Sequence, residues 1–541
     1  MTAGSRILAT LARLPRATSP EVAVERDLAA KMPDGVELLA DRWYPAGESR
    51  APIVVMRSPY GRRQLGVLGR LIAERGYQVV IQSCRGTFGS GGDWEPFRHE
   101  AEDGRATLDW MSGQSWFTGA VGTFGPSYLG LTQWAVAADR PEFLRAMAPS
   151  VTATNFRDAV VFPFGVFALE CALSWAYQVE HQEGHGREVL RSMRRSRRVL
   201  STAYRTMPLR ECDTAAVGHH VPFLQDWLAH DLPGDPYWGP VDFGKAIGQA
   251  PPVSLVGGWY DIFLPWQITD FQAVRAAGGE ARLTVGPWTH TSPGGMGAML
   301  RDGLDWFGTH LSDGDGRAGP PRRAVRLYVM GSRRWVDLDD WPPPADLRRW
   351  HLDGGGRLAA GAPSRVVPDR YRYDPAKPTP SRGGPTLDWR TSGKRDQRDR
   401  EARADVLTYT SEPMPEDTTV AGPLSAQLFV RSSLPHADFC VSLCDVSPRG
   451  KSINLSIGIA RVTVEPDEVT PVEVPMWPTA HAFRRGHRVR VQVSSGAFPL
   501  FARNPGTGDP LASASRLLIA NQEILHDPQH PSGVDLPFSR V

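Results

Sequence analysis

The pattern of apolar positions in the first 150 residues predicts strands that alternate with helices. Residues 24–44 contain two alternating segments joined at Asp34-Gly35, which is typical of a β-hairpin turn. Nearly continuous apolar runs at 52–56 and 77–81 predict buried strands, and a helix-like segment at 66–75 separates them. The alternation continues with a helix at 100–114, a strand at 121–127 and a helix at 128–138. Buried strands that alternate with helices are typical of a parallel sheet covered on both faces.

The pattern changes twice beyond this region. Residues 156–238 contain little strand pattern but predict three helices, at 167–181, 187–207 and 223–230. Strand-like runs return at 253–256 and 282–285, so we expect these helices to be an insertion that covers an α/β domain. After the prolines that follow Trp341, Pro and Gly become frequent and alternating runs appear at 424–430, 438–443 and 488–493. These runs predict an all-β sandwich or jelly roll.

We therefore predict three domains. A discontinuous α/β catalytic domain combines residues 1–150 with 240–340, a helical cap occupies 151–239, and a β domain occupies 345–541. A chain of 541 residues can bury large cores, so disulfides or structural metals are not needed to hold it together.

The composition is that of a globular protein and excludes several classes. Hydrophobic residues make up 41% and charged residues 22% of the chain, which excludes extensive disorder. The 61 basic and 59 acidic side chains leave a net charge of +2, which gives no general attraction to nucleic acid or anionic lipid. Five scattered cysteines without a CxxC pair indicate reduced thiols. No apolar run approaches a membrane span and the run at 7–12 is too short for a signal peptide, so we expect a soluble, cytoplasmic protein.

A serine between glycines marks the candidate chemistry. In the run Gly122-Thr-Phe-Gly125-Pro-Ser127-Tyr128-Leu129-Gly130, a predicted strand enters a predicted helix through a tight turn. This arrangement is typical of a nucleophile elbow, which exposes a serine hydroxyl at the carboxyl end of a sheet. The second glycine lies three residues after Ser127 rather than two, and a purely structural turn remains the alternative for this motif alone.

Two further residues follow in the order that a serine nucleophile of this architecture requires. Asp261 follows the predicted strand at 253–256, and His290 follows the one at 282–285. A serine hydroxyl needs a base, and a neutral imidazole needs a carboxylate to orient it. The order Ser, Asp, His, with each residue at the end of a strand, therefore predicts acyl transfer.

Motifs along nearly the whole chain resemble a known family of serine hydrolases. They lie at 32–41, 57–61, 85–86, 125–130, 257–261, 286–290, 395–398, 405–411 and 438–439. The family includes cocaine esterase, X-Pro dipeptidyl-peptidases, glutaryl acylases and α-amino-acid ester hydrolases. The resemblance implies an α/β-hydrolase fold with an inserted helical cap and a C-terminal jelly-roll domain of the galactose-binding type. The chain departs from the family at Ser83, where an acidic residue is usual two positions before Arg85.

The resemblance also implies roles for individual residues. Ser127 is expected to be the nucleophile, His290 the base and Asp261 the residue that orients it. Tyr60 and the backbone N–H of Tyr128 are expected to form the oxyanion hole. A phenol stays protonated at neutral pH and can donate to an oxyanion, although without the resemblance Tyr60 is a half-buried turn tyrosine.

The residues around the predicted site favour an uncharged substrate. Ile262, Phe263 and Leu264 follow Asp261, and an ammonium group buried against them without a partner is costly. The cap supplies aromatic residues such as Trp175, so we expect Trp175 and Phe263 to line the acyl pocket. We expect a small-molecule carboxylic ester as substrate. An X-Pro dipeptidyl-peptidase acting on short peptides, an amidase or acylase, and an inactive hydrolase with a binding β domain remain alternatives.

No cofactor or metal is predicted. His181 and His185 have the spacing of zinc-binding helices, but Glu183 is misplaced for that motif. The chain contains no Gly-rich phosphate loop and no dinucleotide-binding fingerprint. Six arginines between 187 and 198 indicate a solvated helix face.

Overall fold

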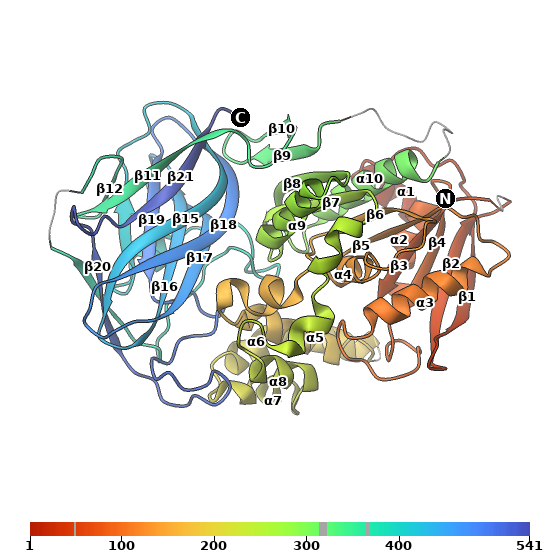
Figure 1. Cartoon of the computed structure of the whole chain (residues 1–541), viewed down its shortest axis with the longest axis horizontal. Coiled ribbons are helices and arrows are strands. Elements are labelled where there is room, and N and C mark those ends of the chain that lie inside the picture. The colour runs from red at the N-terminus through yellow and green to blue at the C-terminus, as the bar shows by residue number, and fades with distance from the viewer. Residues whose placement is uncertain (48–49, 185, 313–321, 364–366) are drawn as a thin grey trace.

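A computed structural model describes residues 1–47, 50–184, 186–312, 322–363 and 367–541. The described residues form a mostly parallel sheet flanked by helices, a group of helices, and a strongly curved β region (Figure 1). In the view of Figure 1 the first sheet lies on the right, the curved β region on the left, and α5–α8 below and between them.

Among the described residues, the first sheet has ten strands in the order β1-β2-β4-β3-β5-β6-β7-β8-β9-β10. They are β1 (Val22–Lys31), β2 (Glu37–Pro45), β3 (Ile53–Ser58), β4 (Gln78–Ser83), β5 (Val121–Pro126), β6 (Leu144–Ser150), β7 (Val253–Tyr260), β8 (Ala281–Thr289), β9 (Val325–Val329) and β10 (Arg334–Leu338). Along this order, neighbouring strands from β4 to β9 pair in parallel. The pairs β1–β2, β2–β4 and β9–β10 at the two edges are antiparallel. All residues of β3, β4 and β7 are buried, because helices cover both faces of a parallel sheet.

Six helices belong to this described part of the chain; α1 precedes the first strand, and the other five lie between strands of the sheet. They are α1 (Ala3–Leu11), α2 (Arg62–Ala73), α3 (Glu100–Ser112), α4 (Tyr128–Ala135), α9 (Leu264–Ala276) and α10 (Pro293–His310). The predicted hairpin at the N-terminal edge is confirmed, with Gly35 at φ +87° in its turn. The strand β6 was not predicted, because its sequence LRAMAPS is poor in β-branched residues and is held by its neighbours β5 and β7.

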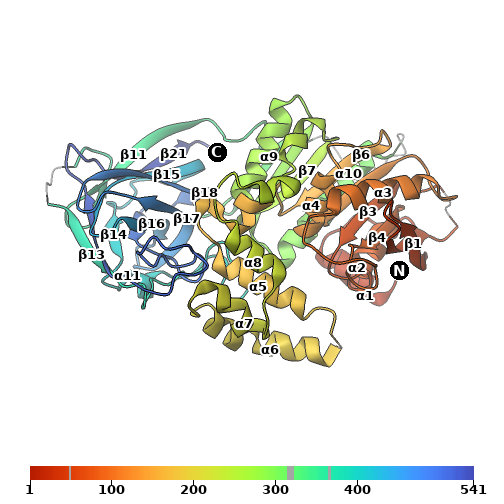
Figure 2. The same cartoon turned by 60° about the horizontal axis from the view of Figure 1, so that its bottom comes forward.

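Between β6 and β7 the chain is helical. It contains α5 (Leu169–Glu180), α6 (Gly186–Ala203), α7 (Cys212–Val217) and α8 (Pro222–Ala229), together with short helical turns at Arg157–Val161, Pro163–Gly165, Leu209–Glu211, Pro236–Val241 and Gly244–Gln249. In Figure 2 α5–α8 lie in the lower middle of the view, with the first sheet to the right and the C-terminal strands to the left. The three predicted helices are confirmed as α5, α6 and α8, whereas the six-residue α7 was missed. No helix in the described part of the chain is long and apolar enough to span a membrane.

The remaining strands form an eleven-stranded sheet, counted over the described residues. They are β11 (Ala345–Asp353), β12 (Arg357–Ala359), β13 (Asp369–Tyr373), β14 (Leu407–Thr410), β15 (Thr418–Ser432), β16 (His436–Val446), β17 (Ser452–Thr463), β18 (Thr470–Phe483), β19 (Arg488–Ser494), β20 (Ala520–Leu525) and β21 (Gly533–Ser539), with the short helix α11 (Arg398–Glu401). The sheet curls until β21 pairs with β15 and closes a ring. This is the expected jelly-roll β region, and the predicted runs at 424–430, 438–443 and 488–493 lie in β15, β16 and β19.

The hydrophobic core joins these parts. One cluster of buried side chains extends from the first sheet through the helices to Trp477 and Phe498 of the C-terminal region. A second cluster, which includes Leu428 and Phe439, fills the β ring. The C-terminal region therefore packs against the same core that positions the ends of β5, β7 and β8.

Candidate active site

The turn between β5 and α4 holds Ser127 in an unusual backbone conformation. Its φ of +58° and ψ of −123° are uncommon for a residue with a side chain, and such strain persists only where the surroundings enforce it. The backbone N–H of Ser127 donates to the carbonyl of Ser150 at 2.9 Å. The carbonyl of Ser127 accepts from the N–H groups of Gly130 and Leu131. These bonds hold the serine at the carboxyl end of β5.

Close packing explains both glycines that flank the serine. A Cβ on Gly125, whose φ is +148°, would lie 2.4 Å from the Cβ of Leu129. A Cβ on Gly130 would lie 2.4 Å from Cγ2 of Thr152, in the segment after β6. The helix α4 therefore approaches the segment after β6 most closely at the position three residues after the serine. This close approach accounts for the shifted second glycine.

Ser127, His290 and Asp261 form one hydrogen-bonded chain. The Nε2 atom of His290 lies 3.0 Å from Oγ of Ser127, and its Nδ1 atom lies 2.8 Å from Oδ2 of Asp261. An ionised carboxylate only accepts hydrogen bonds, so Nδ1 carries the proton and Nε2 faces the serine as an acceptor. The structure thus brings together three residues that lie up to 163 positions apart.

Asp261 is fully buried at the end of β7. Its Oδ1 atom accepts from the backbone N–H of Phe263 at 2.8 Å, which leaves Oδ2 for His290. Its backbone carbonyl accepts from the indole N–H of Trp477, a residue of β18, at 3.0 Å. The sequence pattern around Trp477 gave no sign of this contact, because the contact joins residues that are 216 positions apart.

Tyr60 lies in the turn after β3, with its ring 6.2 Å from that of Tyr128 in an edge-on arrangement. Its hydroxyl oxygen accepts from the indole N–H of Trp175 at 2.9 Å. Trp175 can only donate, so the hydroxyl proton of Tyr60 remains available for another acceptor. Burial raises the pKa of Tyr60 above its usual value, which keeps the phenol protonated.

The side chain of Tyr128 is anchored inside the protein. Its hydroxyl donates to Glu100 at 2.8 Å and accepts from the backbone N–H of Phe97 at 3.0 Å. Burial raises the pKa of Tyr128, so it stays a donor to Glu100. The backbone N–H of Tyr128 is the first of α4, and the first N–H groups of a helix have no partner within the helix. That N–H lies directly beside Ser127 in the chain.

The two predicted pocket residues lie next to the site. Trp175 packs in an aromatic cluster and stacks on Trp227 at 5.8 Å, while its N–H contacts Tyr60. Phe263 is buried and stacks on the ring of His290 at 5.6 Å. Sequence reasoning suggested a lining role for Trp175 and missed its bond to Tyr60.

Two carboxylates of the helical region have partners of their own. The carboxylate of Glu170 accepts from the backbone N–H groups of Leu387 and Asp388, both at 2.9 Å. Burial raises the pKa of Glu170, against the lowering effect of these two bonds. Glu180 lies 2.9 Å from Nε2 of His219. Glu170 therefore ties α5 to a loop of the C-terminal region, a role that sequence reasoning missed.

The structure also describes most of the histidines, the cysteines and Ser83. Within the described ranges, no group of three or more His, Cys, Asp or Glu side chains could hold a metal ion, and His185 lies outside those ranges. All five cysteines are free and buried. Ser83, where the family usually has an acidic residue, accepts from Arg62 at 2.8 Å, and Arg85 pairs with Asp103 at 2.6 Å.

Comparisons with known proteins identify the family of this chain. Residues 34–292 match the family model of X-Pro dipeptidyl-peptidases of the S15 family, and residues 321–535 match that of the X-Pro dipeptidyl-peptidase C-terminal non-catalytic domain. The chain is 33% identical to cocaine esterase of Rhodococcus sp. (strain MB1 Bresler), over 95% of this chain and 98% of that protein.

Two solved structures have the same fold. An α-amino acid ester hydrolase superposes with a TM-score of 0.83 at 24% identity, and an aminopeptidase from a marine sediment archaeon, Thaumarchaeota archaeon, with a TM-score of 0.82 at 24% identity. Each match covers 97% of this chain and 98% of the other. The chain belongs to the serine hydrolase family that includes cocaine esterase and the X-Pro dipeptidyl-peptidases.

Proposed function

We propose that this serine hydrolase cleaves a carboxylic ester with an uncharged acyl group, through an acyl-enzyme on Ser127. The observation that carries the proposal is the hydrogen-bonded chain from Asp261 through His290 to a serine held at positive φ. The 33% identity to a cocaine esterase over nearly the whole chain supports an ester rather than a peptide as substrate.

In the first half of the reaction, Oγ of Ser127 attacks the ester carbonyl carbon while its proton passes to Nε2 of His290. Asp261 stabilises the imidazolium that forms. The tetrahedral intermediate collapses, the bond to the alcohol oxygen breaks, and that oxygen takes the proton from His290. In the second half, water attacks the acyl-enzyme with His290 again as base, and the carboxylic acid leaves as Ser127 regains its proton.

The oxyanion of each tetrahedral intermediate requires donors that are already in place. We assign this role to the hydroxyl of Tyr60 and the backbone N–H of Tyr128. The bond from Trp175 supports the assignment, because it occupies an acceptor site of the Tyr60 oxygen and leaves its proton free. One such donor contributes about 3–4 kcal/mol to the transition state.

Apolar surroundings support an uncharged acyl group. Ile262, Phe263 and Leu264 are all buried directly after Asp261. The carboxylate of Glu170 is bonded to two backbone N–H groups, which leaves it poorly placed to pair with a substrate ammonium. A free amino terminus placed against these apolar side chains would therefore have to be desolvated without pairing with Glu170, which is costly.

The alternative is an X-Pro dipeptidyl-peptidase, the activity in the description of the matched family model. The two activities separate when p-nitrophenyl esters of increasing chain length are compared with Gly-Pro and Ala-Pro p-nitroanilides. We expect much higher kcat/KM for the esters. Turnover of Ala-Pro p-nitroanilide that rivals the esters would refute the proposal in favour of the peptidase, and cleavage of amides alone would favour an acylase.

A fluorophosphonate probe tests the remaining alternative, an inactive hydrolase. The wild-type protein should be labelled at Ser127, and Ser127→Ala should not. Labelling of another serine with Ser127 untouched would overturn the assignment of the nucleophile.

We also propose that the chain has three domains and that the protein is cytoplasmic. The return of the chain to one sheet at β7, after the helices that follow β6, supports the discontinuous domain of residues 1–150 and 240–340. Limited proteolysis should cut first at the boundaries of the three proposed domains, near residues 150, 240 and 340, rather than within a domain. The five free cysteines support a reducing compartment, and detection of the native protein in a cell fraction would test it.

A further inference from the structure

The C-terminal β region reaches the triad through Trp477. The side chain of Trp477 is 3% exposed, and its indole N–H donates to the backbone carbonyl of Asp261 at 3.0 Å. The other N–H near that carbonyl belongs to Leu264, at the longer distance of 3.4 Å. Of these two hydrogen bonds to the backbone carbonyl of Asp261, the one from Trp477 is therefore the shorter.

Packing fixes the direction of this indole N–H. The ring of Trp477 meets Phe164 edge-on at 5.0 Å and Trp266 edge-on at 5.8 Å. Phe164 comes from the segment before α5, and Trp266 comes from α9, which begins three residues after Asp261. The ring cannot turn its N–H away from Asp261 without displacing both neighbours, so the bond has a defined geometry.

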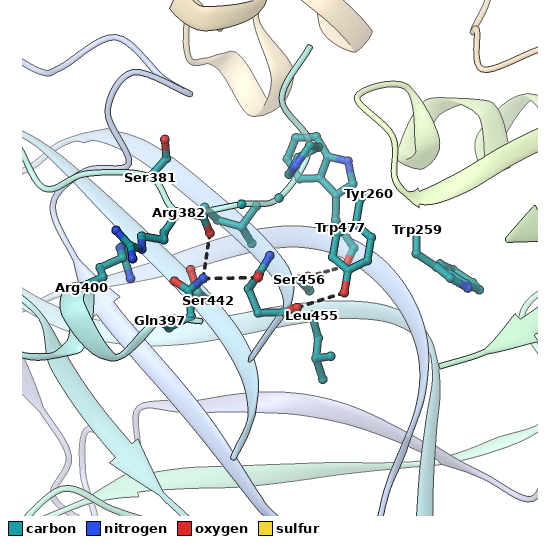
Figure 3. A pocket seen from close by; sticks show the side chains of 15 residues that line it. Trp259, Tyr260, Ser381, Arg382, Gln397, Arg400, Ser442, Leu455, Ser456 and Trp477 are labelled. Carbon is teal, nitrogen blue, oxygen red and sulfur yellow. Dashed lines mark hydrogen bonds between the residues drawn. The ribbon is translucent and has the colours of Figure 1, made fainter. Parts of the chain in front are cut away.

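A second bond joins the same strand end to the C-terminal region. Tyr260, which precedes Asp261, donates its hydroxyl to the backbone carbonyl of Asn454 in β17 at 3.0 Å. Figure 3 shows Tyr260 and Trp477 side by side at the wall of a pocket between β7 and the C-terminal strands. Two consecutive residues at the end of β7 are thus held by two strands of the other sheet.

The strand end that carries His290 has a similar contact. The side-chain amide of Asn454 accepts from the N–H of Arg395 at 2.6 Å and donates to the carbonyl of Gly393 at 3.2 Å. A Cβ on Gly393 would lie 3.1 Å from the methyl carbon of Thr289, the residue before His290. The loop that Asn454 holds therefore packs against the end of β8.

We propose that Trp477 is a positioning residue, whose indole N–H fixes the main chain at Asp261 and so the angle at which its carboxylate meets His290. The proposal rests on the proposed function, in which these residues form the triad. It gives the C-terminal region a part in catalysis, although the matched family model describes that region as non-catalytic.

The test compares two tryptophans that differ in what their N–H groups hold. Trp477→Phe keeps an aromatic ring and removes the N–H. Trp259→Phe is the matched control, because Trp259 is 1% exposed and donates to the backbone carbonyl of Tyr328 in β9 at 2.7 Å and not to that of Asp261. Both variants lose one buried indole N–H with a backbone acceptor.

We expect Trp477→Phe to lower kcat on a p-nitrophenyl ester by about tenfold with little change in KM, since small misplacements of catalytic groups cost up to about a hundredfold. Trp259→Phe should keep kcat near the wild-type value. The far-downfield proton resonance of the hydrogen bond between Nδ1 of His290 and Asp261 should shift or broaden in Trp477→Phe alone. A merely structural role would lower the melting temperature of both variants without moving this resonance.

Equal kcat and an unchanged resonance in the two variants would overturn the proposal. If Trp477→Phe fails to fold, replacement of Trp477 by β-(3-benzothienyl)alanine removes the N–H while it keeps the shape of the ring, and the same outcomes apply. Fluorophosphonate labelling of the wild-type protein separates the two proposals. Absence of labelling at Ser127 refutes the triad itself, whereas labelled wild type with an unimpaired Trp477→Phe variant refutes only the role of Trp477.

Discussion

Asp270 should make the stability of this protein depend on pH in a predictable direction. The carboxyl group lies on α9, is 4% exposed, and accepts from the N–H and the hydroxyl of Thr154 at 2.8 and 2.7 Å. Burial raises its pKa from 3.8 to about 7, against the lowering effect of the two bonds from Thr154, and the nearby Asp242 adds to the rise. Thr154 lies where the chain leaves the sheet for the helical segment, so Asp270 holds that connection.

The sign of the effect follows from the two pKa values. Below about pH 4, Asp270 is protonated in the folded and the unfolded protein. Between about pH 4 and pH 7, the folded protein keeps a proton that the unfolded chain has released, so stability falls as the pH rises through this window. A shift from 3.8 to about 7 corresponds to about 4 kcal/mol, at about 1.4 kcal/mol for each pKa unit. Above about pH 7 this loss of stability is complete.

The assay is urea unfolding of the wild-type protein and of Asp270→Asn at about pH 5 and about pH 8. Relative to the wild type, Asp270→Asn should become more stable by a few kcal/mol at the higher pH, because an amide does not ionise. Other titrating groups are common to both proteins, so they cancel in this difference. A difference between the two proteins that is the same at both pH values would refute the reasoning.

Asp405 supplies a matched control with the opposite shift. Burial alone would raise its pKa, but the bonds from Arg403 at 2.7 Å and Thr379 at 2.7 Å outweigh burial and lower it. Its carboxylate is therefore ionised in both states across this pH range. The stability of Asp405→Asn relative to the wild type should stay constant between about pH 5 and pH 8.

Further predictions concern the elbow and the oxyanion hole. Ser127→Ala should abolish nearly all ester turnover with an unchanged melting temperature, and Asp261→Asn should lower kcat by about 10⁴, as in other serine triads; near-normal turnover of either variant would contradict the triad. Tyr60→Phe should lower kcat by about 10²–10³ with little effect on stability, measured by steady-state kinetics and thermal melting, and an unchanged kcat would remove Tyr60 from the oxyanion hole. Gly130→Ala should destabilise the protein by about 1–3 kcal/mol in urea unfolding, because its Cβ would meet Thr152, and a neutral effect would show that α4 can move.

Local patterns in the sequence were sufficient to predict the framework of the site. Apolar runs predicted the strands β3, β4, β5, β7 and β8, and the glycines around Ser127 predicted the elbow. These features depend on interactions within a few residues: backbone sterics, the burial of β-branched side chains and the strand-to-helix turn. Ser127, Asp261 and His290 were then recognised because each follows a predicted strand and their order along the chain is the one that this architecture requires.

The contacts that orient the site were decided only by the tertiary structure. Trp477 meets Asp261 across 216 positions, Glu170 meets Leu387 across 217, and Trp175 meets Tyr60 across 115. None of these pairs belongs to a repeating pattern, because which side chains meet across two packed layers depends on how the layers pack. The shifted glycine at Gly130 has the same origin, since its meaning lies in Thr152 on a neighbouring segment. Short-range sterics thus determined the turn that presents Ser127. Long-range packing decided which residues hold Asp261 and His290 in place.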